Sequence, residues 1–260
     1  MKKLSIVWWV LMLSLPSPGT VAQTEKRLSL GEQSVFQVSN TSEPILVDGK
    51  MNEEVWKRTE ARTLDNFYNV EDSDDKQRTT FRMLWDNKNL YVFFEMDDRF
   101  ITARERLRDR EPYLDDCAEI FLIPVPDSLD THFGYELNLY KASNDFIYFN
   151  DYYKGEDAVF KAFNPHFNVE VAYDGTINDN SDIDKGWTME LAIPISNFGV
   201  LGTIVPVKEG NRWAFLAIRQ DRNDANGKRR STSTLFPIYD ISKNVHQANR
   251  FGLMEFVKSK

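Results

Sequence analysis

The stretch EPYLDDCAEIF, residues 111–121, contains four acidic residues, and three of them lie within five positions. Asp115 and Asp116 follow a proline and an aromatic residue, and Glu119 lies at the start of an apolar run. Carboxylates at this spacing suit three kinds of chemistry: acid–base catalysis on a sugar linkage, coordination of a hard cation, or hydrogen bonding to a polar ligand. The choice between them depends on the elements that position these side chains.

The alternation of side chains along a strand separates these acids. The apolar run predicts a β-strand, in which successive side chains point to opposite faces of the sheet. Glu119 then shares a face with Cys117, whereas Asp116 points the other way and caps or solvates the strand entry. The spacing therefore disfavours an acid–base pair within the stretch. Glu119 still needs a partner or a ligand, because a carboxylate in an apolar strand is costly to leave unpaired.

Motifs of other common reactions are missing from the sequence. The three histidines, His132, His166 and His246, are far apart and form no zinc-binding pattern. There is no nucleophile elbow and no glycine-rich phosphate loop. The acidic run that begins at residue 180 resembles a calcium loop, but Lys185 replaces the invariant glycine and Leu191 the bidentate acid. A solvated turn is the better interpretation, and a structural calcium ion in another geometry stays open.

The elements predicted around the acids are almost all strands. Residues 77–85 and 90–96 form a hairpin around a polar turn, with Phe81, Met83 and Trp85 on one apolar face. Further strands are predicted at residues 118–123, 135–140, 146–150, 167–173, 187–193, 213–220 and 251–256. Many short strands separated by polar turns indicate an all-β fold, a single antiparallel β-sandwich of the jelly-roll or immunoglobulin-like kind.

The first 22 residues predict export. Two lysines precede an apolar stretch at 4–15, which two prolines end before a small-residue cleavage site at Ala22. This is the plan of a secretory signal peptide, and the apolar stretch is too short to span a membrane. We expect a secreted or periplasmic protein without membrane insertion. It would have a leading segment at 23–43 and one domain at 44–260.

The net charge limits the kinds of partner that the protein can bind, and the cysteine content limits its covalent chemistry. The formal charge of −8 becomes −10 when the signal peptide and its two lysines are removed. An acidic protein is a poor match for nucleic acid, whose binding requires clustered Lys and Arg. The single cysteine, Cys117, excludes an intrachain disulfide, and its apolar surroundings favour a buried inert thiol over a nucleophile.

Four motifs in order resemble those of family 9 carbohydrate-binding modules. PILVDGKMNEEVW (44–56) is similar to the family's opening motif, and LWDNKNLYV (84–92) to its W-D-x-x-x-L-Y-V hairpin. PYLDDCAEIF (112–121) matches P-W-x-x-D-x-x-E-I-F, and FGLMEF (251–256) matches the closing strand. The resemblance covers residues 44–257. It implies a β-sandwich that binds sugars without transforming them, often beside xylanases.

The resemblance also implies a set of ligand-binding residues. Tyr113 takes the position of one of two tryptophans that sandwich a sugar, Glu119 that of a sugar-binding glutamate, and Asn138 that of a binding asparagine. Two departures stand out. Glu136 replaces an arginine, and the second tryptophan is absent where the chain has His246. His246 either stacks on or hydrogen-bonds the ligand, or caps the last strand.

Further polar residues are assigned to the same site. Arg219 and Asp221 lie where the resemblance places ligand-side loop residues, with a surface ion pair as the alternative. Arg108 and Asp109 line the same rim or form a charged turn. Asp116 supports the rim.

Three functions remain open at this stage. The favoured one is an exported, non-catalytic protein that binds oligo- or polysaccharide of the xylan or glucan type, with polysaccharide-degrading enzymes as partners. The second is a glycoside hydrolase that uses Glu119 and Glu136 across one pocket. The third is a haem-binding relative with Met96 and His246 as ligands. No cofactor is required by the favoured function.

Overall fold

The computed structural model describes residues 35–124, 126, 131–153, 156–201, 207–224, 226, 228–238 and 244–259. The predicted signal peptide lies outside these residues. Within them, no helix has the length and apolar character needed to cross a membrane.

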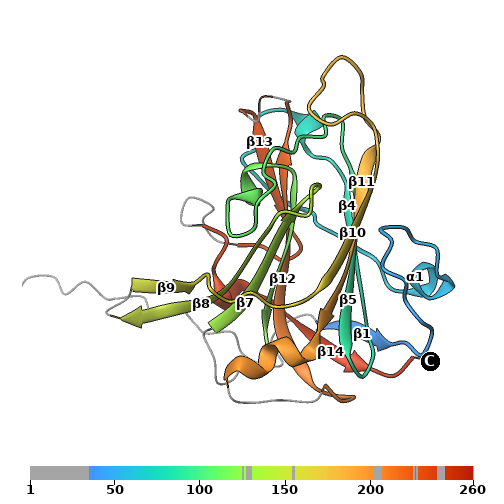
Figure 1. The fold of residues 1–260 in the computed structure, drawn as a ribbon, viewed down its shortest axis with the longest axis vertical. Coiled ribbons are helices and arrows are strands. Elements are labelled where there is room, and N and C mark those ends of the chain that lie inside the picture. The colour runs from blue at the N-terminus through green and yellow to red at the C-terminus, as the bar shows by residue number, and fades with distance from the viewer. Residues whose placement is uncertain are drawn as a thin grey trace, which may run out of the picture.

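The strands form two facing layers of a β-sandwich (Figure 1), as the sequence predicts. The first layer contains, in spatial order, β10 (Asn168–Asp174), β11 (Gly186–Pro194), β5 (Asn89–Asp97) and β4 (Thr79–Trp85). The second contains β14 (Gly252–Val257), β12 (Arg212–Arg222), β6 (Cys117–Ile123), β7 (Thr131–Asn138), β8 (Ser143–Tyr153) and β9 (Glu156–Phe160). Three short strands extend the layers: β2 (Arg62–Thr63), β3 (Asn66–Tyr68) and β13 (Arg230–Thr234).

One strand joins the layers into a continuous sheet. β1 (Val35–Asn40) lies between β4 and β14 and is parallel to both, whereas the other strand pairs of the described residues are antiparallel. β1 falls inside the expected leading segment at 23–43, so that part of the segment belongs to the sandwich. The helical pieces are short: α1 (Glu54–Arg58), η1 (Ser73–Asp75), η2 (Pro112–Leu114), η3 (Ile195–Leu201) and η5 (Ala248–Arg250).

The main core fills the space between the layers. Phe81, Met83 and Trp85 of β4 face it, as their alternation predicts, and Trp187 and Trp213 enter it from the first and second layers respectively. Burial of such large apolar side chains supplies most of the driving force for folding. The core consequently uses the inner faces of both layers, and the outer faces are left for other contacts.

The outer face of the first layer is covered by the segment that contains α1. Trp56 packs on Phe93 and donates from Nε1 to Oε1 of Glu190 at 2.9 Å. The other oxygen of Glu190 accepts from the backbone N–H groups of Asp48 and Gly49, at 2.9 and 3.1 Å. Gly49 has φ of +75°, a conformation that favours glycine. The motif at 44–56 therefore anchors this cover.

Candidate functional site

The outer face of the second layer carries a line of polar side chains across three strands. β6 and β7 are paired so that Glu119 lies opposite Glu136, and β8 continues the line with Asn144 opposite Glu136. The next line contains Phe121, Gly134 and Phe146. Because paired residues of a sheet point to the same face, the acids and the aromatic rings share one surface.

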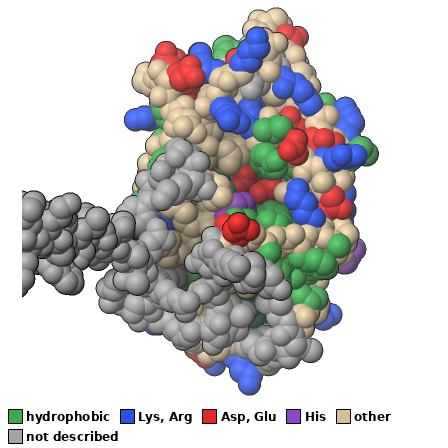
Figure 2. Space-filling view, turned by 90° about the vertical axis from the view of Figure 1, so that its left-hand side faces the viewer, with side chains coloured by type: hydrophobic (Ala, Val, Ile, Leu, Met, Phe, Trp, Pro, Cys, Tyr) green, Lys and Arg blue, Asp and Glu red, His purple; other side chains and the backbone are tan. Residues whose placement is uncertain are grey.

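A pocket of about 400 Å³ opens on this surface. In Figure 2 acidic side chains and a histidine gather in the middle of the face beside hydrophobic ones. The lining comes from β6, β7, β8, β9, β12, β13 and adjacent segments: Asn69, Tyr113, Glu119, Glu136, Asn144, Phe146, Tyr148, Val159, Lys161, Gln220, Arg230, Thr232, Asn244, Val245 and His246. Four of these residues, Tyr113, Glu119, Glu136 and His246, are among those that the sequence assigned to ligand binding.

Glu119 forms the floor of the pocket without a hydrogen-bonding partner. Its side chain is 1% exposed, and neither carboxylate oxygen accepts a hydrogen bond from any described residue. Burial raises the pKa of Glu119 to about 7, opposed by the nearby Gln220 side chain and the Arg222 charge. Gln220 lies near this carboxylate without meeting hydrogen-bond geometry. An unpaired buried carboxylate is costly in the empty protein, and a ligand that donates hydrogen bonds removes that cost.

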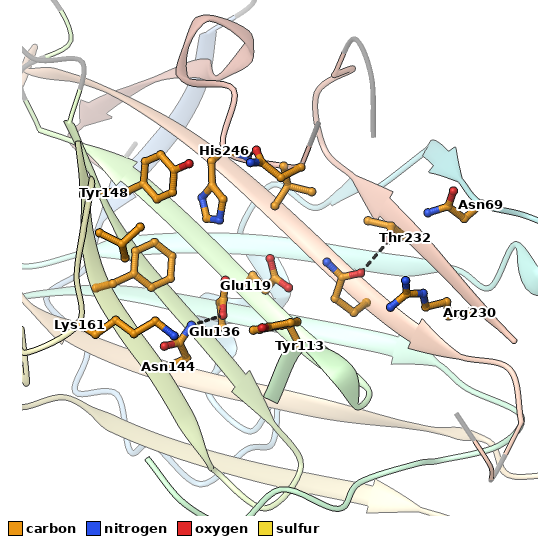
Figure 3. Close-up of a pocket in the computed structure, with 15 residues that line it drawn as sticks. Asn69, Tyr113, Glu119, Glu136, Asn144, Tyr148, Lys161, Arg230, Thr232 and His246 are labelled. Atoms are coloured by element: carbon orange, nitrogen blue, oxygen red, sulfur yellow. Dashed lines mark hydrogen bonds between the residues drawn. The ribbon is translucent and has the colours of Figure 1, made fainter. Parts of the chain in front are cut away.

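Glu136 lies beside Glu119 on the floor (Figure 3) and is better supported. Its Oε2 accepts from Nδ2 of Asn144 at 2.6 Å. Burial, and then the charge of Glu119, raise the pKa of Glu136 well above its ordinary value. Oδ1 of Asn144 is buried without a partner among the described residues. The floor thus presents several oxygen acceptors that the protein leaves unsatisfied.

Tyr113 stands at one side of the pocket, on η2. Its hydroxyl donates to Oε1 of Glu111 at 2.7 Å, and burial together with Glu111 raises its pKa. Arg222 fixes the backbone below the ring, because its guanidinium donates to the carbonyl oxygens of Tyr113 and Leu114. The ring is therefore held by its backbone and remains half-buried, with the hydroxyl engaged outside the floor.

His246 forms part of an aromatic wall of the same pocket. Its ring stacks on Tyr148 with centroids 4.2 Å apart and on Phe121 at 4.8 Å. Nδ1 of His246 and Nε2 of His132 are 2.9 Å apart, so one ring donates to the other. Burial lowers the pKa of His246 to about 4 and that of His132 well below 6.5. His246 is thus a neutral ring in the wall of the pocket, and its role towards a ligand stays a prediction.

Three residues assigned to ligand binding lie on the other side of the sheet. Asp116, Arg219 and Asp221 are buried between the layers, with Asp98. Arg219 donates to Asp98 at 3.1 Å and forms an ion pair with Asp221 at 3.1 Å, and Asp116 accepts from the backbone N–H groups of Thr102 and Arg222. They form a structural cluster outside the pocket.

The remaining assigned residues hold the loop that carries Tyr113. Nδ2 of Asn138 donates to Glu105 O and to Asp115 Oδ2, both at 2.8 Å, so its amide is engaged within the protein. Arg108 pairs with Asp145 at 2.6 Å. These residues do not line the pocket, and neither does Asp109, whose N–H donates to the carbonyl of Ser143.

The buried cluster of Asp98, Asp116 and Asp221 is also a candidate for the structural calcium site considered from the sequence. Among the described residues, Asp98, Asp116 and Asp221 are the one group whose ligand atoms lie close enough to hold a metal ion. The guanidinium of Arg219 lies among them and supplies a positive charge, so their contacts fit an internal ion pair better than calcium. In the turn considered from the sequence, Asp184 accepts from the N–H groups of Ile101 and Thr176.

The haem ligands considered from the sequence do not meet. Met96 points into the core between the layers, whereas His246 belongs to the pocket on the outer face of the second layer. The sheet separates the two side chains, so this pair does not form a haem site.

Several pocket residues were missed from the sequence. Asn144, Phe146 and Tyr148 alternate along β8, and the pairing of β8 with β7 brings them to the face of Glu136. Alternation also predicts the orientation of Gln220. This residue lies between Arg219 and Asp221, and its side chain points to the opposite face of the sheet from theirs. A strand register anchored on Glu119 would have selected Gln220.

The comparison with protein families decides what kind of domain this is. Residues 47–259 match the family described as carbohydrate family 9 binding domain-like. The chain belongs to this family. It is therefore a carbohydrate-binding module, and its motif at 112–121 supplies both Tyr113 and Glu119 of the pocket.

Solved structures share the fold of this family 9 module. A family 9 module from Caldicellulosiruptor kristjanssonii in complex with glucose superposes with a TM-score of 0.59 at 17% identity, covering 87% of this chain and 97% of that chain. The complex with cellotriose gives the same score and identity, covering 86% and 95%. A candidate carbohydrate-binding protein from Bacteroides uniformis gives 0.62 at 15% identity, covering 86% and 99%. No match was found among the curated proteins.

Proposed function

We propose that this module binds a sugar unit of an oligo- or polysaccharide in the pocket over Glu119 and Glu136, and that it does not cleave it. The observation that carries the proposal is the unpaired carboxylate of Glu119 at the bottom of a pocket with aromatic walls. Sugar hydroxyls donate to such oxygens, and the C–H face of a sugar ring packs on aromatic side chains.

The geometry suits a small polar ligand. A volume of about 400 Å³ lies in the range of small-molecule sites. Tyr113 stands on one side of the floor and the rings of Tyr148 and His246 on the other (Figure 3). The neutral His246 ring takes the place of the second sandwiching tryptophan of the family, which this sequence lacks.

The class of glycan is also a proposal. Family 9 modules of similar fold have been solved with glucose and cellotriose, which supports a gluco-oligosaccharide as the first ligand to test. Xylan remains an alternative within the same class. The predicted signal peptide supports a location outside the cytoplasm, where the module would meet polysaccharide and the enzymes that degrade it. Intact-mass measurement of the exported protein tests this location. A mass that corresponds to a chain beginning at Gln23 supports it, and a mass that includes residues 1–22 contradicts it.

The test is calorimetric titration of the mature protein with cello- and xylo-oligosaccharides, beside Tyr113→Ala and Tyr113→Phe. We expect saturable binding that weakens by ~1–3 kcal/mol in Tyr113→Ala, because the stacking surface is lost. Tyr113→Phe keeps the ring and loses only the bond to Glu111, so its affinity should stay within about threefold of wild type. Equal affinity of all three proteins would place the sugar elsewhere.

A glycoside hydrolase is the second candidate, and the raised pKa values of Glu119 and Glu136 favour it. Hydrolysis requires two carboxyl groups that flank the scissile bond. Glu119 and Glu136 instead project side by side from neighbouring strands of one sheet. We expect no new reducing ends when the protein is incubated with the oligosaccharide that it binds. Release of reducing ends that Glu119→Gln abolishes would establish the enzyme.

A further inference from the structure

The unsatisfied groups on the pocket floor are all acceptors. Both oxygens of Glu119 and Oδ1 of Asn144 are buried without a hydrogen-bonding partner among the described residues. Nδ2 of Asn144, the donor beside them, is already used by Glu136. Thr232 donates to Oε1 of Gln220, so that oxygen is occupied as well. The floor therefore calls for a ligand group that brings several donors to one point.

The chemistry of the floor selects among the groups that sugars carry. A hydroxyl brings one donor and also two acceptor lone pairs, which would face the carboxylate oxygens. An ammonium group brings three donors, no acceptor and a positive charge. Hydrogen bonds from a charged donor to a carboxylate are about twice as strong as those between neutral groups.

We propose that the pocket selects a sugar unit with a free, protonated amino group, whose nitrogen binds over the carboxylates of Glu119 and Glu136. The inference rests on the proposed sugar-binding function and names the ligand class within it. The aromatic rings that flank the floor then pack on the sugar ring, as they would for a neutral sugar.

The charges around the floor are consistent with this choice. Glu119 on β6 faces Glu136 on β7, and the buried cation near it, Arg222 on β12, is engaged with backbone carbonyls of the Tyr113 loop. The wall contributes His246 in its neutral form. Buried carboxylates act on a ligand through a less polar medium than solvated rim charges do.

Two exposed cationic side chains at the rim of the pocket modify the electrostatic field at its floor. They are Lys161, which follows β9, and Arg230 at the start of β13. The charge of Lys161 lowers the pKa of Glu136, so this ammonium already acts on the floor. A ligand ammonium would compete with Lys161 for the same carboxylates, and removal of Lys161 should therefore favour the ligand.

The test is a titration series of glucose, glucosamine and N-acetylglucosamine, together with cellotriose and the glucosamine trimer, at pH 6.5 and low salt. We expect each amine to bind about tenfold more tightly than its neutral counterpart, because a charge-assisted hydrogen bond exceeds a neutral one by this margin. N-acetylglucosamine has no charged nitrogen and should lose the advantage.

Proton release gives a second readout. An ammonium beside Glu119 favours the ionised carboxylate, so binding of glucosamine at pH 6.5 should expel up to about one proton. The binding enthalpy would then change with the ionisation enthalpy of the buffer, and that of glucose would change less, because a neutral hydroxyl favours the ionised carboxylate more weakly than an ammonium does.

Three variants make the assignment specific. Glu119→Gln keeps the size of the side chain and should abolish both the amine preference and the proton release. Lys161→Gln should raise the affinity for the amines by a few-fold relative to the affinity for glucose. Glu170→Gln, on β10 of the other layer, is the matched control and should behave as wild type.

The outcomes separate this inference from the proposed function. If neutral sugars bind as tightly as the amines, or if Glu119→Gln keeps the preference, the amine selection is wrong while sugar binding stands. If neither amine nor neutral sugar binds, both proposals fail.

Discussion

Glu119 and Glu136 lie directly opposite each other on β6 and β7, and both are buried on the same face of the sheet. Like charges at paired positions of a sheet are destabilising, and burial adds a desolvation cost to each. A pair of this kind weakens the empty domain, which is the usual relation between a binding site and stability. The following predictions measure that cost and its location.

Glu119→Gln should stabilise the protein at high pH. The pKa of Glu119 is about 7 in the folded protein against an ordinary value of 4.5, so the unfolded chain releases this proton first. Stability that is present below pH 4.5 is therefore lost as the pH rises towards and through 7. Relative to wild type, Glu119→Gln should gain up to about 3 kcal/mol at pH 8 compared with pH 4.

Urea unfolding at both pH values measures this gain. Glu170→Gln serves as the control, because its carboxylate is exposed on β10 and pairs with Lys141. A stability difference between Glu119→Gln and wild type that does not change with pH would contradict the assignment.

His246→Gln should change how the free energy of unfolding depends on pH in the acidic range. Burial lowers the pKa of His246 from 6.5 to about 4. Between these two pH values the unfolded chain therefore binds a proton at His246 and the folded protein does not. The wild type then loses stability as the pH falls from 6.5 to 4, by up to about 3 kcal/mol, and His246→Gln should show a flatter profile in that window. The slope of the unfolding free energy against pH is the measurement. His166→Gln, at an exposed histidine outside the pocket, is the control variant. A slope that His246→Gln does not flatten would show that His246 titrates normally.

The strands and their hairpins could be predicted from the sequence because period-two alternation is a local signal. Phe81, Met83 and Trp85 face the core as that pattern requires. β1 was not predicted as part of the domain, because its place between β4 and β14 depends on pairing across more than 200 residues.

Four pocket residues, Tyr113, Glu119, Glu136 and His246, were named from the resemblance to the family rather than from alternation. Alternation assigned Glu119 and Asp116 to opposite faces of the strand, and Glu119 lines the pocket whereas Asp116 is buried between the layers. Arg219 and Asp221 were assigned by position along the chain, one residue away from Gln220, and a shift of one residue in a strand exchanges the two faces of the sheet. Asn144, Phe146 and Tyr148 required knowledge of the pairing between β7 and β8, which no local pattern contains.

Arg219 and Gln220 provide the direct test of which face binds the ligand. Arg219 is 1% exposed among Asp98 and Asp221, so Arg219→Met leaves buried carboxylates without their cation and should lower the free energy of unfolding by ~3–5 kcal/mol. The folded fraction of this variant should still bind sugar with wild-type affinity, because the residue faces away from the pocket. Gln220→Ala, one residue further along the strand, should give the opposite pattern.

Gln220 lines the pocket beside Glu119, so its truncation should weaken sugar binding several-fold at a stability cost of about 1 kcal/mol for the lost bond with Thr232. Chemical denaturation and calorimetric titration of the two variants under the same conditions give both quantities. Weaker sugar binding by stable Arg219→Met would restore the ligand-binding role that the sequence suggested. Because the two residues are neighbours on one strand, a general disturbance of β12 would affect both variants alike. Opposite effects therefore identify the outer face of the second layer as the binding surface.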